Sequence, residues 1–353
     1  MSYPLVSVII VNWNGEKHLR SCLSSLYVLD YPSDKVEIIF SDNGSKDNSL
    51  DFLKKNFPKV KIVENGENLG FAEGNNRGFI HANGKYLALL NNDSVADKSW
   101  LKNSVDVLEK DEKIAAVGSK ILIWNDQNPA FDLSNKIAVS WPKVDPWTGF
   151  CFNFVDNRPQ SKVDYLPGAA MIVRKKVYDQ IGGMDKEFFA YFEETDWCAR
   201  MIKAGYDCVY VPTSVIWHKV EASALAHSSD FHDKMMVRNR LLFILKNFDL
   251  KNLIFFVFYY FLEVFAKSVF YVLNSLILVY QKTLNKPGLD ESQQRVTFYF
   301  REIKFAPWAV FWNFSNLVNI FSERKKEASK VKLRSYNDNL PLKSVVPNLQ
   351  VLK

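Results

Sequence analysis

The chain has 353 residues, which fits two domains better than one, and its 48% hydrophobic, 14% aromatic and 24% charged residues exclude a disordered or fibrous protein. The net charge is +6, and residues 321–353 hold eight Lys/Arg against three Asp/Glu, so five of the six surplus charges lie at one end. This distribution argues against a basic nucleic-acid-binding face, and it indicates a tail that contacts an anionic partner.

Residues 1–120 alternate short β-branched runs with helical patterns, as a parallel sheet with right-handed crossovers requires. Strands are predicted at Leu5–Val11, Val36–Ser41, Val60–Glu64, Tyr86–Leu90 and Ala115–Gly118. Helices are predicted at Glu16–Leu26, Lys46–Asn56, Ala72–Asn83 and Ser99–Lys110. We therefore expect an α/β fold with a doubly wound, mostly parallel sheet and helices on both faces.

Polar clusters follow three of these strands. They are Asn12 to Gly15, Asp42 to Ser45, and Asn91 to Asp93. In open α/β sheets, ligands bind outside the carboxyl ends of the strands, so the three clusters are predicted to converge on one crevice.

The middle of the chain is less regular. Residues 124–165 carry Pro, Trp and Asn without clear periodicity, and we expect an insertion on the acceptor side of the crevice. Regular elements are then predicted at Met171–Val173 (strand), Lys175–Ile181 and about Glu193–Ala204 (helices), and Asp207–Val211 and Val215–Trp217 (strands).

A change in composition near residue 225 marks a C-terminal helical region. Residues 253–280 contain only five clearly polar positions in 28, and two of them, Glu263 and Lys267, can pair at i,i+4. A helix here is long enough to span a bilayer, but each central charge would cost about 2.5–3.5 kcal/mol. We therefore favour a helix that lies in the membrane interface or packs on the catalytic domain by its polar stripe. The alternative is a soluble helical subdomain.

An aromatic segment, Phe305–Phe321, follows and runs into the basic tail. Such a tail is attracted to anionic lipid at about 1 kcal/mol per Lys or Arg. The four cysteines show no metal-type spacing and are expected to be reduced thiols of a cytosolic-side protein, and no secretory signal is visible.

Two acidic residues at strand ends are candidate ligand contacts. Asp93 emerges after a buried strand, where a carboxylate can hold Mg²⁺ or Mn²⁺, although Asn-Asn-Asp is also an ordinary turn sequence. Asp42 could accept hydrogen bonds from a base or ribose. In the same stretch, Ser45 or Asp47 could cap the following helix.

Three acids within four positions, Glu193, Glu194 and Asp196, follow an aromatic run. They would favour a helix dipole, and carboxylates beside aromatics are also how the pKa of a general base is raised. The lone His218 ends the last strand and is more often structural than a ligand. Gly70, with glycines at 74 and 78, indicates either a close helix-to-strand approach or a loop that faces a nucleotide; the spacing is not GxGxxG.

Taken in order, these residues resemble the inverting glycosyltransferases of family 2, which have the GT-A fold, and within them the rhamnosyltransferase-like branch. The resemblance covers about residues 4–245. The matching stretches are Val6 to Gly15, Ser41 to Ser45, Asn68 to Ala72, Gly74 to Asn76, Leu90 to Asp93, Pro167 to Met171, Gly182 to Asp185, Tyr191 to Trp197, and Val211 to His218.

The resemblance implies transfer of a sugar, rhamnose or similar, from a dTDP- or UDP-linked donor to a hydroxyl of a saccharide or lipid-linked acceptor, with inversion, in cell-surface polysaccharide or glycolipid synthesis. Asp93 would be the metal-binding acid of a reduced DXD motif, with His218 completing an Mg²⁺ or Mn²⁺ site. Glu194 would be the base, with Asp196 as the competing candidate. The nucleotide-sugar contacts would be Asn12, Asn14, Asp42, Asn43, Gly70, Asn75, Asn92 and Asp93.

These inferences divide the chain into a GT-A catalytic domain at 1–245, a hydrophobic helical region at 246–322 and a basic, disordered tail at 323–353. The nucleotide-binding half would be 1–120 and the acceptor-side half 121–245. We expect a protein at the cytoplasmic face of the cell membrane, peripheral or anchored by a single helix, with no nucleic-acid partner. A catalytically silent scaffold that binds a nucleotide sugar is the alternative; a nucleotidyltransferase is disfavoured because no basic loop follows the first strand.

Overall fold

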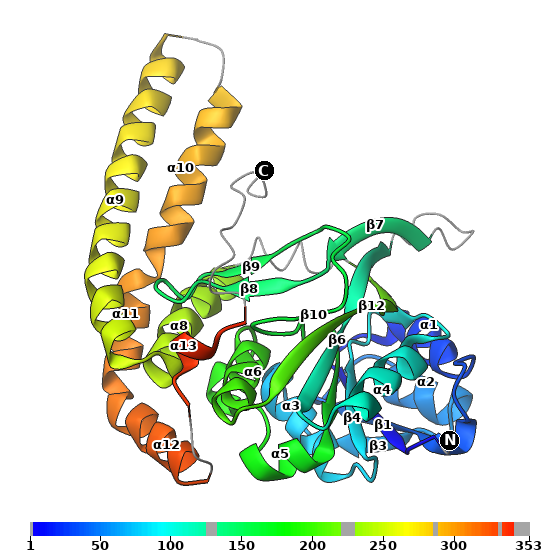
Figure 1. The fold of residues 1–353 in the computed structure, drawn as a ribbon. Coiled ribbons are helices and arrows are strands. Elements are labelled where there is room, and N and C mark those ends of the chain that lie inside the picture. Colours follow the sequence, from blue (N-terminus) through cyan, green and yellow to red (C-terminus); the bar gives the residue numbers. More distant parts are fainter. Residues whose placement is uncertain (1–2, 125–132, 220–229, 285–288, 331–333, 342–353) are drawn as a thin grey trace.

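The computed structural model describes residues 3–124, 133–219, 230–284, 289–330 and 334–341 (Figure 1). Its body is built on a ten-stranded sheet with the order β10-β12-β6-β11-β4-β1-β2-β3, in which β5 pairs with β12 and β7 with β6. A second, two-stranded sheet joins β8 and β9. The strands are β1 Val6–Asn12, β2 Val36–Asp42, β3 Lys61–Glu64, β4 Tyr86–Leu90, β5 Ser94–Ala96, β6 Ile114–Trp124, β7 Leu133–Val139, β8 Pro142–Val144, β9 Cys151–Asn153, β10 Ser161–Lys162, β11 Ala170–Arg174 and β12 Asp207–His218.

The expected α/β architecture is confirmed, with one addition. The β1–β2, β1–β4, β2–β3 and β6–β12 pairs are parallel, and β11 lies antiparallel between β4 and β6. The helices of the body are α1 Glu16–Leu26, α2 Ser49–Asn56, α3 Gly70–Ile80, α4 Trp100–Lys110, α5 Lys175–Ile181 and α6 Glu193–Lys203, with short 3₁₀ turns at Ser33–Lys35 and Lys186–Phe188.

The two faces of the sheet are covered by different helices because side chains alternate along each strand. In β1, Val6, Val8 and Ile10 contribute to a core that includes residues of α1, α2 and α4. Ile9 points to the other face and contributes to a core with residues of α3, α5 and α6. Parallel strands buried on both faces in this way place their polar ends at one edge of the sheet.

Several predicted bounds were wrong for local reasons. Helix α2 begins at Ser49 and not at residue 46. The two strands predicted at 207–211 and 215–217 are one strand, β12, with a register shift between Val211 and Val215. The irregular segment 124–165 contains β7 to β10, whose short lengths leave little periodicity to detect.

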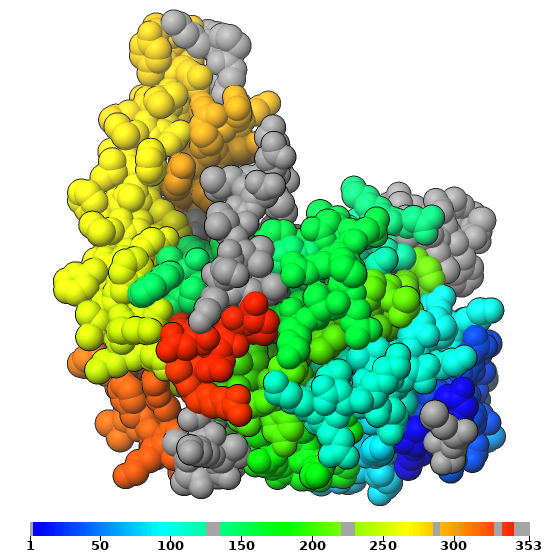
Figure 2. Space-filling model, viewed as in Figure 1, coloured from blue at the N-terminus to red at the C-terminus, as the bar shows by residue number. Residues whose placement is uncertain are grey.

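The C-terminal region is helical. It comprises α8 Asp230–Asn247, α9 Leu250–Thr283, α10 Leu289–Lys304, α11 Ala306–Ser315, α12 Leu317–Lys330 and α13 Tyr336–Asn339. Helix α8 packs on the body, whereas α9 and α10 run alongside each other and project from it (Figure 1). In the space-filling view, α9 forms an outer edge of the molecule (Figure 2).

Within the described part of the chain, α9 is the one helix that is long and apolar enough to cross a membrane, and only 6% of its apolar window is buried. Its two interior charges face α8, where Glu263 accepts hydrogen bonds from Arg240 at 2.9 and 3.0 Å and from Lys267 at 2.6 Å. The exposed face of α9 is therefore apolar.

The residues predicted to form a disordered tail are partly ordered. Helix α12 continues through 323–330, and α13 follows at Tyr336–Asn339. Tyr336 is fully buried and its ring packs against Phe243 and Phe248. The prediction failed for these residues because composition does not reveal an aromatic anchor that packs on a distant helix. The domain boundaries themselves stay a prediction.

Candidate functional site

The carboxyl ends of β1, β2 and β4 are joined by a buried hydrogen-bond network centred on Asn12. Asn12 Nδ2 donates to Ser45 Oγ and Ser49 Oγ, both at 3.0 Å, and lies 3.3 Å from Asp42 Oδ1. Asn12 Oδ1 accepts from Asn92 Nδ2 at 2.6 Å. The predicted convergence of the three strand ends is therefore present in the structure.

The turn after β2 is fixed by side chains from β1. Ser45 N donates to Asp42 Oδ2 at 2.8 Å, and Ser45 Oγ accepts from Asn14 N at 2.9 Å, so Ser45 ties two loops together and does not cap α2. Asp47 accepts from Ser49 N at 3.1 Å instead. Asn14 is exposed and has a φ of 54°, which a short polar side chain tolerates.

The start of α3 lies beside the β2 turn. Asn43 Nδ2 donates to Gly70 O at 2.9 Å. Gly70 has a φ of +75°, and a Cβ at this position would collide with the carbonyl oxygen of Phe189, so glycine is required here. Asn75, by contrast, is buried and donates to Phe71 O at 2.9 Å within its own helix. Its side chain supports α3 and does not line the cavity described below.

Asp93 and His218 come together from β4 and β12. Asp93 Oδ1 lies 3.0 Å from His218 Nε2, and both side chains are only 13% exposed. That oxygen forms no aligned hydrogen bond. Burial raises the pKa of Asp93, but the neighbouring imidazole outweighs it and the net shift is downward. Asp93 is therefore held as a carboxylate.

These two groups fit a divalent cation. A carboxylate oxygen and an imidazole nitrogen suit Mn²⁺, which also accepts phosphate oxygens as ligands. Among the residues that the structure describes, no three His, Cys, Asp or Glu side chains are grouped to hold a metal ion. The donor set on the protein is thus two groups, and a bound diphosphate would supply further ligands.

A cavity of 620 Å³ opens beside this pair. Its walls come from β6, β7, β9, β12, α3, α6, α8, Asn91 just after β4, and the loops at 165–169 and 190–192. The polar side chains on it are Asn91, Asn153, Tyr165, Tyr191, Glu193, Glu194, Thr195, His218 and His232. The cavity therefore extends from His218, at the carboxyl end of β12, to the first turn of α6.

Two neighbouring carboxyls, Glu193 and Glu194, face this cavity. Burial and the charge of Glu194 raise the pKa of Glu193 well above its usual range, and burial also raises the pKa of Glu194. Glu193 Oε2 has no hydrogen-bond partner. A raised pKa within a cavity is what a general base requires. Glu193 was not among the predicted site residues, although the run of three acids in four positions pointed to it.

The segment that leads into this carboxyl pair is strained. Phe189, Tyr191 and Phe192 have φ values of 63°, 71° and 73°, in the left-handed region that bulky residues rarely adopt. Strain of about 1–3 kcal/mol per residue persists only where surrounding contacts hold it, and such residues cluster at functional sites.

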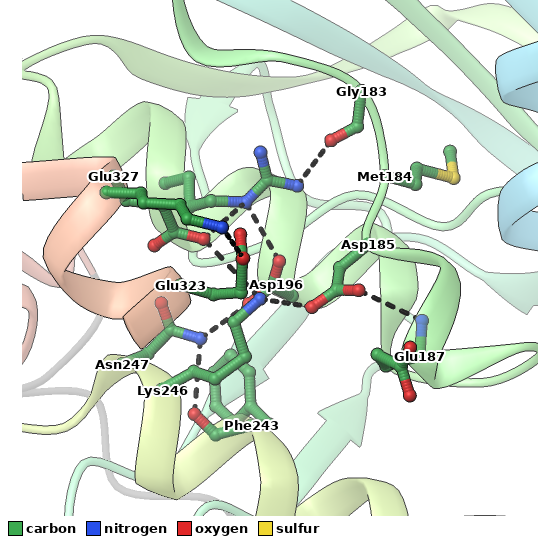
Figure 3. A network of polar contacts seen from close by, with 12 residues as sticks. Gly183, Met184, Asp185, Glu187, Asp196, Phe243, Lys246, Asn247, Glu323 and Glu327 are labelled. Atoms are coloured by element: carbon green, nitrogen blue, oxygen red, sulfur yellow. Dashed lines mark hydrogen bonds and ion pairs between the residues drawn. The ribbon is translucent and has the colours of Figure 1, made fainter. Parts of the chain in front are cut away.

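The second predicted base, Asp196, is placed elsewhere. It is fully buried on the opposite side of α6, where it accepts from Arg200 Nε at 2.9 Å and Asn247 Nδ2 at 2.8 Å (Figure 3). Lys246 Nζ lies 3.5 Å away. Burial raises the pKa of Asp196, but the charges of Lys246 and Arg200 lower it far more. Asp196 does not line the cavity, so its position favours Glu194 over Asp196 as the base.

Lys246 is the centre of the network in Figure 3. Its Nζ lies 2.5 Å from Asp185 and 3.4 Å from Glu327, in addition to Asp196, and only 2% of its side chain is exposed. Glu327 belongs to α12, so the network joins α6 to the C-terminal helices.

Replacing Lys246 by methionine should lower the free energy of unfolding by about 3–5 kcal/mol, because it removes the buried cation that Asp185, Asp196 and Glu327 share, although Arg200 still pairs with Asp196. Urea unfolding followed by circular dichroism measures this. Lys251→Met is the matched control, since the Lys251–Asp338 pair is exposed and should contribute less than about 1 kcal/mol. Equal effects of the two substitutions would contradict the role of Lys246.

Comparison with known proteins places these residues in a family. Residues 7–182 match the family described as Glycosyl transferase family 2. The chain belongs to glycosyl transferase family 2. The matched segment runs from β1 to the end of α5, so it includes Asn12, Asp42 and Asp93, while Glu194 and His218 lie beyond it.

Curated relatives of this family 2 protein act on varied substrates. It is 27% identical over 239 residues to the N-acetylglucosaminyl-diphospho-decaprenol L-rhamnosyltransferase of Mycobacterium tuberculosis, covering 61% of this chain and 76% of that protein. It is 37% identical over 123 residues to an uncharacterized glycosyltransferase of Haemophilus influenzae, where the match covers 34% of this chain and 38% of that protein's length.

Solved structures share its fold. A mannosyltransferase of Pyrobaculum calidifontis in complex with GDP-Man and Mn²⁺ aligns with a TM-score of 0.50 and 14% identity over 93% of this chain and 81% of that one. GalNAc-T7 with UDP, GalNAc and Mn²⁺ aligns with a TM-score of 0.55 and 17% identity over 70% of this chain and 48% of that one. The expected GT-A fold is confirmed.

Proposed function

We propose that this family 2 glycosyltransferase moves a sugar from a nucleoside diphosphate sugar to a hydroxyl of a lipid-linked saccharide, with inversion at the anomeric carbon. The observation that carries this proposal is one cavity lined both by His218, which forms a cation-binding pair with Asp93, and by Glu194, a carboxyl with a raised pKa. A donor diphosphate at one edge and an acceptor hydroxyl at the other would meet within it.

The donor would lie over the ends of β1, β2 and β4. Asp42 is buried and faces the turn where a base and ribose would bind, and the amides of Asn12 and Asn92 are hydrogen-bonded to each other, and that of Asn43 to Gly70 O. Asn14 and Gly70 shape the two loops that border this surface. Rhamnose is the first sugar to test, because the mycobacterial relative is named a rhamnosyltransferase, and dTDP and UDP are the nucleotides that the motif resemblance implies.

Asp93 and His218 would hold Mg²⁺ or Mn²⁺. The cation would neutralise charge on the departing diphosphate. The protein's own part is to keep Asp93 ionised and to hold the imidazole 3.0 Å from it. The Asn91 side chain, 3.3 Å from His218 Nε2, orients the ring.

Glu194 would act as the base. Its carboxylate takes the proton of the acceptor hydroxyl as the hydroxyl oxygen forms a bond to the anomeric carbon and the bond from that carbon to the diphosphate oxygen breaks. The transition state has oxocarbenium character, as in glycoside hydrolysis. Glu193 lies beside it, and burial keeps the pKa of Glu194 above its usual value.

The test is release of nucleoside diphosphate from dTDP-rhamnose, UDP-glucose, UDP-N-acetylglucosamine and GDP-mannose, each with Mn²⁺ or Mg²⁺, with and without an N-acetylglucosaminyl diphospho-lipid as acceptor. Release that needs both the cation and the acceptor supports transfer. Tight nucleotide-sugar binding with no turnover on any pair would instead support the silent scaffold.

Helix α9 would bring the enzyme to its acceptor by lying in the membrane interface. Large apolar side chains on its outer side are exposed, among them Phe258, Phe261 and Phe265 at 68%, 71% and 69%. These three recur at i, i+3 and i+7 and share one face. Glu263 is turned toward the body and pairs with both Arg240 and Lys267, so no charge interrupts this face.

Replacing Phe258, Phe261 and Phe265 together by glutamate should remove the protein from liposomes that contain anionic lipid in a flotation assay, since burying three carboxylates is costly. Ile80→Glu is the control, because Ile80 is equally exposed, at 68%, on the far body helix α3. Flotation of the triple variant at the wild-type level would rule out this face as the membrane contact.

A further inference from the structure

Helix α8 holds the backbone of the strained loop 187–192 through two adjacent side chains. Asn239 Nδ2 donates to the carbonyl oxygens of Phe188, Ala190 and Tyr191 at 2.9, 2.8 and 2.7 Å. Arg238 Nη2 donates to those of Glu187 and Phe188 at 2.6 and 2.9 Å. The carbonyl oxygens of residues 187, 188, 190 and 191 thus accept hydrogen bonds from two adjacent side chains that lie about fifty residues further along the chain.

The orientation of the Asn239 amide is fixed. Its Oδ1 accepts from Arg238 Nε at 2.7 Å, which leaves both amide hydrogens for the loop. Asn239 is fully buried, so water does not replace these bonds. Each buried carbonyl left without a donor would carry the cost of an unsatisfied polar group, in addition to the strain that Phe189, Tyr191 and Phe192 store.

The same loop reaches both sides of the cavity. On one side it leads directly into α6 and the Glu193–Glu194 pair. On the other, Phe189 O accepts from Phe71 N at 2.7 Å and Ala72 N at 3.2 Å, at the start of α3. The geometry of this loop therefore sets the position of the base relative to the donor-side helix α3.

Helix α8 is in turn fixed by the C-terminal helices. Asn313 of α11 donates to Arg238 O at 3.1 Å, and the Arg238 guanidinium stacks 4.5 Å above the Trp312 ring. Arg240 pairs with Glu263 of α9. Arg238, which holds the loop, is thus itself contacted by α11, and the neighbouring Arg240 is paired with α9.

We propose that Asn239, assisted by Arg238, is a positioning residue for sugar transfer: its amide holds the 187–192 loop in its strained shape and so aims Glu194 at the acceptor hydroxyl. This rests on the proposed function, and it adds a residue that touches neither substrate nor cation. Asn239 acts through the loop carbonyls alone.

The experiment compares Asn239→Leu, which keeps the side-chain size and removes the donor, with wild type. The donor is whichever nucleotide sugar of the panel the wild type turns over. We expect kcat to fall at least 100-fold, donor binding by calorimetry to change less than threefold, and the acid limb of the pH–kcat/KM profile to move to lower pH as the loosened loop admits water to Glu194. The control is Asn252→Leu, a residue equally buried, whose amide donates to Pro146 O at 2.9 Å away from the loop.

A fall in kcat without movement of the acid limb, or an equal fall in Asn252→Leu, would show a merely structural role and overturn the proposal. A kcat within threefold of wild type would overturn it too. If Asn239→Leu does not fold, Arg238→Met, which keeps an unbranched side chain and removes the guanidinium, must show the same kcat loss and pH shift, and its failure to do so sinks the idea. Absence of turnover in the wild type itself would instead refute the proposed function.

Discussion

Glu194→Gln should lower kcat for sugar transfer by about 10²- to 10⁴-fold and leave donor binding unchanged. The amide has the size of the carboxyl but cannot accept the proton of the acceptor hydroxyl, and general-base catalysis contributes a factor of this order. Transfer is measured as nucleoside diphosphate release in the presence of acceptor, and donor binding by calorimetry. Glu187→Gln is the matched control, since Glu187 is an exposed acid of the same segment.

The pH dependence follows from the same carboxyl. Burial raises the pKa of Glu194, and Glu194 is active when ionised, so activity should fall with decreasing pH at a higher value than an ordinary glutamate would give. The folded state also holds a proton that the unfolded chain releases, so stability should rise as pH falls toward the usual glutamate pKa. Glu194→Gln is therefore expected to raise Tm at neutral pH. A variant that lost neither activity nor its acid limb would mean that Glu194 is not the base.

Asp93→Asn should reduce cation-dependent turnover by at least about 100-fold. The loss of one of two protein ligands weakens cation binding, and a catalytic cation contributes several kcal/mol of charge stabilisation, at 1.36 kcal/mol per tenfold in rate. The measurement is turnover against Mn²⁺ concentration, in which the half-maximal concentration should rise steeply. Raising Mn²⁺ should recover part of the activity.

Asp106→Asn provides the control for this prediction, because Asp106 is exposed on α4 and remote from the strand ends. Asp93→Asn also removes the carboxylate charge that lies beside the His218 imidazole, so the melting temperature of the variant is compared with that of the wild type. Full turnover of Asp93→Asn at the wild-type Mn²⁺ requirement would exclude the Asp93–His218 pair as the cation site.

The sequence predicted what depends on local pattern. Strands such as Val6–Asn12 are short apolar runs with polar residues at one end, and parallel pairing then brings those ends together without further information. The convergence of Asn12, Asp42 and Asn92 was predictable for this reason.

Other features depend on contacts between distant residues and were not predictable. Nothing near Asp196 in the sequence reveals that Lys246 pairs with it and that Asn247 donates a hydrogen bond to it, so it remained the competing candidate to Glu194. Likewise, Ser45 looked like a helix cap because its partner, Asn14, belongs to another strand end. The hold of Asn239 on the 187–192 loop has no local signal either, since buried asparagines on helices usually bond within the helix, as Asn75 does.

The ion network around Lys246 has a consequence for how the protein could be divided. Asp196 and Asp185 belong to the body, Lys246 to α8 and Glu327 to α12, so the charge balance of the core is completed from three separate stretches of chain. Where a membrane anchor forms a separate module, a protease can remove it from the protein, and the anchor can be exchanged in evolution. Here such a cut would leave a buried lysine cluster short of one carboxylate. We therefore expect the C-terminal helices and the body to unfold together, so that shortening the chain before α12 should lower the stability of the body.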